Sequence, residues 1–443
     1  MKKFDILIVG GGIVSSYIIK RIEGCDLKIA IVDKFNCIND DIEKTYYEGI
    51  SGYRDKKFGG LSEFWGGQIQ DIDFESILSI LNLEGVECTK NEFKLARDRV
   101  IKLLKVELEE SSLSEKEVES KYKRVLNSWI GKSRLLGRDA DLIIDKHEIA
   151  LKQGKVNKIT FDKFKNTYKI ELIDNNHSTN ILYSNKVFFC GGVLGLAEYI
   201  LGVNPSKVLN YSDHYSIAIA NISKFSDLGK LITPYFFNRK LITPRIYFAN
   251  SEFSNNLSLY STLPFQKELG EMRQAKKKSL FSVLLYILRN KKFFSLSFFV
   301  LRMGYSFWLN KKVPLKANRL NVNALIDTNL LKNRAIRISN KNNCVGALTK
   351  SDFIDVKNKV FEKLIELDSK KYNILESQSQ YFECAYHAYC LVDHHGFNAS
   401  KELTDMGVNV FCPSELRNIG DRNPVFATLV LTELKLNKIN LIE

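Results

Sequence analysis

The sequence predicts an α/β fold in which a parallel sheet, extended by a β-meander, is joined to a second domain built on an antiparallel sheet. Three observations lead to this fold class. A strand runs directly into a glycine-rich turn at residues 4–16, several strand patterns lie between 142 and 190, and short strand patterns recur between 216 and 339. Because 443 residues can bury more than one core, we expect two or more domains.

The N-terminal stretch has the pattern of a dinucleotide-binding turn. An apolar strand ends at Gly10, which can make a tight turn, and Gly12 lets a pyrophosphate approach the backbone and the N-terminus of the next helix. Ser15 stands where a third glycine is usual, so helix and strand would pack slightly less closely. A second strand ends in Asp33, where a carboxylate can accept hydrogen bonds from ribose hydroxyls. This order of elements predicts a Rossmann-like domain.

A second glycine-rich stretch contains Gly60, Ser62, Trp65 and Gly66. Such a loop can lie tight against a flat ligand and offer backbone N–H donors. A plain turn anchored by a tryptophan is the alternative interpretation. Residues 76–130 follow with a helical periodicity and a highly charged face, and are expected to form a helical insertion.

The stretch between residues 142 and 201 changes to strand patterns, with strands expected at 156–161, 168–173 and 181–190. The last strand ends in Gly191-Gly192, before a helix at 193–201. A meander, a buried strand and two glycines are typical of a flavin-type nucleotide domain, whereas a domain that binds only a nicotinamide has no need of the meander.

The C-terminal stretch reads as a strand and turn that end in Ser414, followed by a helix that begins at Asn423 and Pro424. Proline at the first helical position behind an Asn cap is a well-formed helix start. It directs backbone N–H groups, and the positive end of the helix dipole, toward whatever lies before it.

The eight cysteines are scattered without a C-x-x-C pair, which favours free thiols in a reducing compartment over disulfides or a zinc site. The N-terminal apolar stretch is one strand long, so we expect no secretory signal and a cytoplasmic protein. The net charge of +14 is concentrated at 272–326, which has twelve Lys or Arg and no Asp or Glu.

Within this basic segment, the apolar pieces 280–288 and 293–301 are each far shorter than the ~20 residues of a membrane-spanning helix. One interpretation is an element that lies on an anionic membrane surface, at residues 272–319, which would make the protein peripheral on the inner membrane face. The other is a helix pair that lids the substrate pocket. Nucleic-acid binding is disfavoured because the basic residues alternate with aliphatic ones.

The sequence resembles the glucose–methanol–choline (GMC) family of FAD-dependent oxidoreductases. The similarity lies in four blocks, at 9–16, 59–67, 187–201 and 409–439. The resemblance implies a discontinuous FAD-binding domain formed by 1–75, 131–210 and 395–443. It also implies a substrate domain at 211–394, built on the antiparallel sheet.

The resemblance also implies which residues hold the cofactor. The corresponding positions are Gly10, Gly12, Ser15, Asp33, Gly60, Ser62, Trp65, Gly66, Gly191, Ser414, Asn423 and Pro424. In some members a histidine in the tryptophan loop is joined covalently to the flavin. Phe64 stands at that position here, so FAD is expected to bind non-covalently.

For catalysis, the resemblance implies a histidine and Asn423 beside the flavin. His387 is the preferred base, with His394 and His395 as other candidates, although Cys390 interrupts the family's H-x-x-G-T motif. The implied reaction is oxidation of a CH–OH group, in which an imidazole takes the hydroxyl proton while hydride leaves for flavin N5.

The expected substrate is a sugar or alcohol, and analogy with the family suggests surface polysaccharide biosynthesis. Two other functions stay open: a flavoprotein reductase or desaturase of a lipid, and a non-catalytic, membrane-associated FAD-binding scaffold. No metal site is expected, and the sequence does not indicate the electron acceptor or the oligomeric state.

Overall fold

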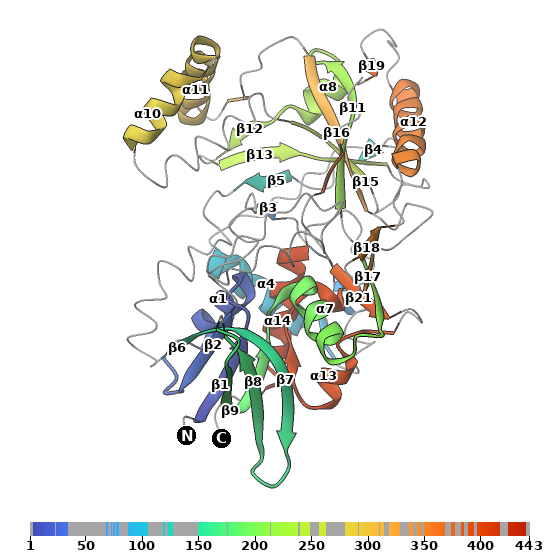
Figure 1. The fold of residues 1–443 in the computed structure, drawn as a ribbon. Helices are drawn as coiled ribbons and strands as arrows, with labels where there is room; N and C mark the ends of the chain where they lie inside the picture. Colours follow the sequence, from blue (N-terminus) through green and yellow to red (C-terminus); the bar gives the residue numbers. More distant parts are fainter. Residues whose placement is uncertain are drawn as a thin grey trace.

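The protein is described from a computed structural model. The residues that it describes are 3–22, 24–33, 68–69, 72, 74–75, 77–78, 87–104, 118–119, 123–126, 149–174, 176–212, 214–237, 240–248, 257–262, 280–290, 292–309, 311–313, 319–327, 336–339, 343–346, 350–367, 374–376, 382–384, 389–393, 397–416 and 424–439. Figure 1 shows two lobes, one around a largely parallel sheet and the other around antiparallel sheets.

A seven-stranded mixed sheet forms the first lobe, with the order β6-β2-β1-β9-β8-β7 and with β22 paired to β9. Its parallel strands are β1 (Lys3–Val9), β2 (Ile29–Asp33), β6 (Ala150–Gln153), β9 (Thr179–Phe189) and β22 (Asn409–Val410). The antiparallel strands β7 (Lys155–Asp162) and β8 (Thr167–Ile173) lead into β9. The predicted β-meander is therefore confirmed.

Helices cover both faces of this sheet. The helices on one face are α1 (Ile13–Arg21), α4 (Lys90–Leu104) and α14 (Pro424–Leu436), whereas α7 (Gly192–Val203) covers the other. Ile6 and Ile8 pack with α1, α4 and α14, while Leu7 and Val9 belong to the cluster that contains α7. Burial on alternate faces explains why β1 is continuously apolar from Ile6 to Val9, as expected for a central parallel strand.

The second lobe contains another seven-stranded sheet, with the order β19-β11-β16-β15-β14-β4 and with β20 paired to β11. Its strands are β4 (Val118–Glu119), β11 (His214–Ser223), β14 (Ile246–Phe248), β15 (Leu257–Ser261), β16 (Arg319–Asp327), β19 (Ile374–Glu376) and β20 (Phe382–Cys384). All of its pairings are antiparallel. The helices α8 (Asp227–Ile232) and α12 (Lys350–Leu367) contact β11.

Two four-stranded sheets complete the fold. One has the order β12-β13-β5-β3 and consists of β12 (Tyr235–Phe237), β13 (Lys240–Pro244), β5 (Lys123–Leu126) and β3 (Gln68–Ile69). The other has the order β18-β17-β10-β21 and consists of β18 (Asn343–Gly346), β17 (Ile336–Ser339), β10 (Val208–Ser212) and β21 (Tyr389–Asp393). The remaining elements are α10 (Leu280–Arg289), α11 (Phe293–Trp308), α13 (Lys401–Asp405) and the 3₁₀ turn η4 (Pro413–Glu415).

The predicted fold class is confirmed, because a parallel sheet with a meander is joined to antiparallel sheets. The helical pattern expected over 76–130 is found in α4, whereas β4 and β5 are strands. These two short strands depend on partners more than a hundred residues away, β14 and β13, so local periodicity could not indicate them. The predicted domain boundaries stay predictions.

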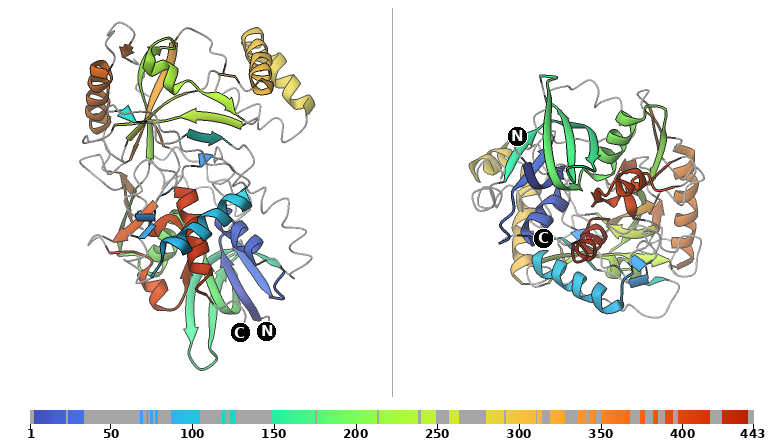
Figure 2. Two further views of the ribbon diagram at one scale, coloured as in Figure 1. Left: turned by 180° about the vertical axis from the view of Figure 1, so that it is seen from behind. Right: turned by 90° about the horizontal axis from the view of Figure 1, so that it is seen from below.

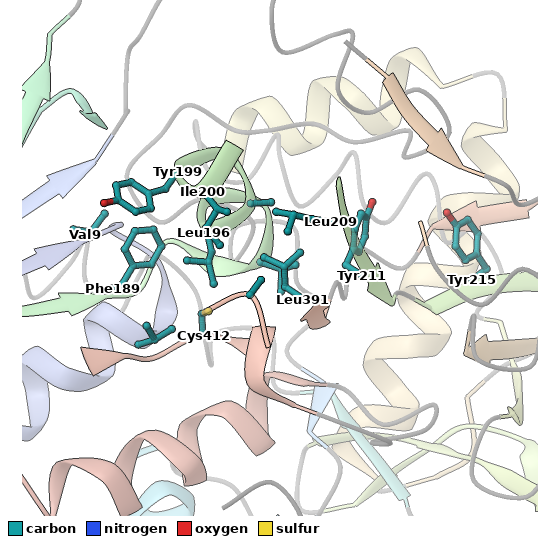
Figure 3. Packing of buried hydrophobic residues seen from close by; sticks show 14 of the residues in the cluster. Val9, Phe189, Leu196, Tyr199, Ile200, Leu209, Tyr211, Tyr215, Leu391 and Cys412 are labelled. Carbon is teal, nitrogen blue, oxygen red and sulfur yellow. The ribbon is translucent and has the colours of Figure 1, made fainter. Parts of the chain in front are cut away.

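One apolar core runs through both lobes. Figure 3 shows it passing from Val9 and Phe189 in the parallel sheet, through Leu209 in β10, to Tyr215 in β11. All four side chains are buried. The two lobes therefore share packed side chains, which fixes the antiparallel sheet relative to the glycine turns.

Candidate functional site

The first glycine turn is closely packed against the second. Gly10 has φ +97°, in the left-handed region that favours glycine, and its N–H donates to the carbonyl of Val32 at 2.7 Å. A Cβ at Gly10 would lie 2.7 Å from Gly191 Cα and 2.8 Å from the carbonyl oxygen of Cys190. Glycine is therefore required at Gly10 by the contact between the two turns as well as by its φ.

Gly12 differs, because a Cβ there would meet nothing within 4 Å. It is the N-cap of α1, whose first turn contains no acidic residue. The N-terminal N–H groups of a helix have no partner within the helix, and together with the helix dipole they favour an anion. The open space and these donors fit the pyrophosphate of a dinucleotide.

The carboxylate of Asp33 lies beside the same turn. Its Oδ2 accepts a hydrogen bond from the N–H of Gly11 at 2.6 Å, which ties the end of β2 to the turn after β1. The structure thus places an acid next to the glycine turn, where the resemblance expects the adenosine ribose. Its contact with a ribose stays a prediction.

Ser15 and Cys190 join the helix to the two turns. The Ser15 hydroxyl donates to the carbonyl of Gly10 and also interacts with the Cys190 thiol, and both side chains are buried. Burial raises the pKa of the Cys190 thiol, so it stays protonated. The serine that replaces the third glycine therefore holds the turn, and its predicted role at the pyrophosphate is untested.

The C-terminal segment returns to this edge of the sheet. β22 pairs in parallel with β9, and the N–H of Phe411 donates to the carbonyl of Phe189 at 2.8 Å. Ser414, which is fully buried, shares a 2.7 Å hydrogen bond with the thiol of Cys412. The chain then enters α14 at the buried Pro424, so residues from both ends of the sequence meet in one lobe.

A buried carboxylate fastens α14 to α1 and α4. Glu433, with 0% side-chain exposure, accepts hydrogen bonds from the Tyr17 hydroxyl at 2.8 Å, from Arg21 Nε at 3.1 Å and from Arg99 Nη1 at 2.9 Å. The pKa of the Tyr17 hydroxyl is raised, mainly by burial and secondly by the negative charge of Glu433. Sequence reasoning missed this cluster, because Tyr17 and Glu433 stand 416 residues apart.

Several predicted site residues lie outside the described part of the chain. They are Gly60, Ser62, Trp65 and Gly66 of the tryptophan loop with Phe64, the histidines His387, His394 and His395, and Asn423. Their predicted roles stay predictions. In the sequence, β3 follows the tryptophan loop, β21 lies between His387 and His394, and α14 follows Asn423.

Cys390, which interrupts the H-x-x-G-T motif, keeps a glycine-like backbone. Its φ is +55°, in the left-handed region that a non-glycine residue seldom adopts. This is a conformation that a glycine would adopt without strain.

A polar face of the seven-stranded antiparallel sheet was also missed. Ser216 Oγ shares a 2.7 Å hydrogen bond with Tyr260 Oη and accepts another from Asn323 Nδ2 at 3.1 Å. The buried Arg245 donates from Nη1 to Ser258 Oγ at 2.9 Å and stacks over the Tyr260 ring at 5.5 Å. Ser216 lies on β11, Tyr260 and Ser258 lie on β15, and Asn323 lies on β16. Arg245 stands between β13 and β14.

The same polar face includes a buried pair at the strand ends. His214 Nε2 lies 3.9 Å from Asp327 Oδ2, and both side chains are fully buried. The opposite face of β15, Leu257 and Leu259, belongs to the apolar core. Alternation of polar and apolar residues in β15 was the available sequence signal for this polar face.

This combination of a glycine turn, a parallel sheet with a meander and an antiparallel domain is shared with a solved oxidase structure. Among solved structures, the chain is similar to pyridoxine 4-oxidase from Mesorbium loti, with a TM-score of 0.50, 11% identity and 99% of each chain covered. It is also similar to formate oxidase, with a TM-score of 0.46, 9% identity, and 100% of this chain and 99% of the other covered. No protein-family model and no curated protein matches the chain. At 11% identity, the likeness to pyridoxine 4-oxidase shows the fold alone.

Proposed function

We propose that this protein is an FAD-dependent oxidoreductase of the GMC type, which oxidises a CH–OH group of a sugar or alcohol. The observation that supports this most is the cradle at the edge of the parallel sheet. There the turn at Gly10–Gly12, the acid Asp33 and the returning segment with Ser414 lie in one lobe. The likeness to pyridoxine 4-oxidase over the full length of both chains supports the same class.

The described residues fit a dinucleotide, since the space at Gly12 is open and the helix N-terminus beside it offers donors. Gly10, Gly12 and Ser15 would hold the pyrophosphate side, Asp33 the ribose, and Gly191 and Ser414 the part that leads to the flavin. When bound, FAD supplies the acceptor for a hydride. With Phe64 in the tryptophan loop, the binding is proposed to be non-covalent.

The proton chemistry is assigned to His387 and Asn423. His387 as a neutral imidazole takes the proton of the substrate hydroxyl, and Asn423 donates a hydrogen bond to the oxygen as negative charge develops on it. The N-terminal N–H groups of the helix that begins at Pro424 would add positive potential near Asn423. The glycine-like φ of Cys390 supports the choice of His387 over the other two histidines.

The polar sheet face is proposed as the wall that binds the substrate. Its hydroxyl, amide and guanidinium groups offer donors and acceptors at buried positions (Ser216 and Arg245) and half-buried positions (Tyr260 and Asn323). A hydroxyl-rich substrate can exchange further hydrogen bonds with such groups, whereas a lipid tail can form none with them. This face therefore favours a sugar or polar alcohol over the lipid alternative.

The experiment is a test of flavin content followed by anaerobic reduction. The purified protein should be yellow, and FAD should leave with the supernatant when the protein is denatured. Sugars and polar alcohols should bleach the bound flavin, and His387→Ala should slow the bleaching at least about a hundredfold while it keeps FAD. Arg245→Met should raise KM about tenfold or more, with less effect on kcat.

Protein that neither carries FAD nor can be reconstituted with it would refute the proposed class. FAD binding with an unaltered reduction rate in His387→Ala would refute only the assignment of the base. His394→Ala and His395→Ala are the matched controls for that assignment, because they remove neighbouring imidazoles.

A further inference from the structure

The outer face of α11 is an exposed apolar stripe at the far end of the second lobe. Its members are Phe294, Phe298, Leu301, Tyr305 and Trp308, which are 84%, 62%, 72%, 61% and 66% exposed. Their spacing of four, three, four and three residues places them on one side of the helix. Figures 1 and 2 show α10 and α11 standing at the edge of the molecule, away from the parallel sheet.

The opposite side of α11 is fixed to the protein. Phe299 is buried with Phe236 of β12 and Val313, and the ring of Phe307 packs edge-on against Phe236 at 5.6 Å. The N–H of Phe236 also donates to the carbonyl of Lys311, at 2.9 Å, just beyond the helix. The helix therefore has two apolar sides, and packing among the described residues buries one of them while the other is exposed.

Cations lie along the exposed stripe. The Arg302 guanidinium is 5.6 Å from the centre of the Phe298 ring, and Lys311 Nζ is 5.3 Å from the centre of the Tyr305 ring. Arg289 and Lys292 are exposed between α10 and α11. The sequence from 272 to 326 contains no acidic residue, so no carboxylate of this segment opposes them.

We propose that this stripe of α11 and its neighbouring cations dock the protein on an anionic phospholipid surface. Aromatic and aliphatic side chains would enter the boundary between headgroups and acyl chains, while Arg302 and Lys311 would contact phosphates. Trp and Tyr favour this boundary because each ring combines apolar area with one polar group. Docking adds a location to the proposed oxidoreductase and does not depend on its chemistry.

The dimensions indicate a helix that lies on the membrane. The 16 residues of α11 extend for about 24 Å at 1.5 Å per residue. This length is below the ~30 Å hydrocarbon thickness of a bilayer. In the part of the chain that the structure describes, no helix is both long and apolar enough to cross a membrane. The stripe runs along the helix axis, so all of it can touch one surface when the helix lies flat.

A second copy of the chain is a poorer partner for this surface. An isologous contact would bring the cations of one stripe close to those of its copy, because the same patch is used on both sides. Anionic lipid instead offers opposite charge and apolar depth together. The exposure of the stripe also argues against the interpretation of α10 and α11 as a pocket lid, in which this face would be covered.

The test uses the full-length flavin-loaded protein and sedimentation with vesicles. One set of vesicles is phosphatidylcholine, and the other is equal parts phosphatidylcholine and phosphatidylglycerol. We expect binding to the anionic vesicles only, and a decrease of that binding as salt is raised. The double variant Phe294→Ser/Trp308→Ser should bind at least about tenfold less. The variant Arg302→Glu/Lys311→Glu should bind at least about twentyfold less.

The matched control is Phe164→Ser, at the turn between β7 and β8. Phe164 is fully exposed, and Figure 1 shows the β7–β8 hairpin at the end of the molecule away from α11, so loss of this side chain should leave vesicle binding unchanged. Retention of flavin by each variant reports that the fold is intact, and the charge variant tests the proposal independently if the apolar variant loses flavin. The proposal would be overturned if the wild-type protein did not bind anionic vesicles, or if both variants bound them as tightly as the wild-type protein does. So would a dimer in solution that the Phe294→Ser/Trp308→Ser change converts to a monomer without any binding to vesicles.

Discussion

Replacement of Glu433 by glutamine should loosen the helix layer that covers the parallel sheet. The carboxylate of Glu433 accepts hydrogen bonds from Tyr17, Arg21 and Arg99, and so joins α14 to α1 and α4. Glutamine has almost the same size and can still accept from the Tyr17 hydroxyl. The change therefore removes the negative charge while it leaves little or no cavity.

The expected loss of stability is about 2–3 kcal/mol, from hydrogen bonds to a charged group that are each worth about 1.5–3 kcal/mol. This expected loss is smaller than the ~3–5 kcal/mol that removal of one partner of a fully buried ion pair costs. The reason is that the side chains of Arg21 and Arg99 are 40% and 52% exposed and can be hydrated after the change.

The assay is urea unfolding followed by flavin release, together with hydrogen exchange of peptides from α1, α4 and α14. Glu433→Gln should lower the urea midpoint and speed exchange in those three helices. The control is Glu171→Gln, which removes a surface carboxylate paired with Lys169 and should leave the midpoint unchanged. A double-mutant cycle with Tyr17→Phe should show coupling above about 0.5 kcal/mol. An unchanged urea midpoint together with no coupling to Tyr17 would refute the conclusion that Glu433 holds α14 to α1 and α4.

Three further predictions concern local backbone and charge. Gly10→Ala should abolish stable folding, because its Cβ would clash with Gly191, whereas Gly12→Ala should fold normally in thermal melts but lose FAD affinity. Cys390→Gly should raise stability by about 1 kcal/mol, since it relieves a left-handed conformation, and an equal or lower melting temperature would contradict this. Hydrogen bonds from Thr89 lower the pKa of Glu92, so the carboxylate stabilises α4 above the ordinary glutamate pKa and loses this effect as pH falls through its lowered value. Glu92→Gln should therefore lower the unfolding midpoint at neutral pH, and the difference from wild type should vanish in acid; a difference that persists there would contradict it.

Much of the first lobe could be predicted from sequence because its signals are local. The apolar run before Gly10, the three meander strands and the helix start at Pro424 each depend on residues close in the chain. The second lobe was harder to predict. β4 and β5 are short strands whose hydrogen-bond partners lie in distant segments, so periodicity alone suggested a helix.

The sequence by itself determined the glycine turn, the meander and the basic apolar segment. Backbone freedom, strand alternation and local net charge depend only on residues that are close together in the chain. Only the tertiary structure decided that Glu433 meets Tyr17, that Arg245 lies on a polar sheet face, and that the outer side of α11 stays exposed. A single polar contact contributes about 1 kcal/mol, which is too little to impose a pattern on the sequence around it. Such contacts depend on which distant segments the common core brings together.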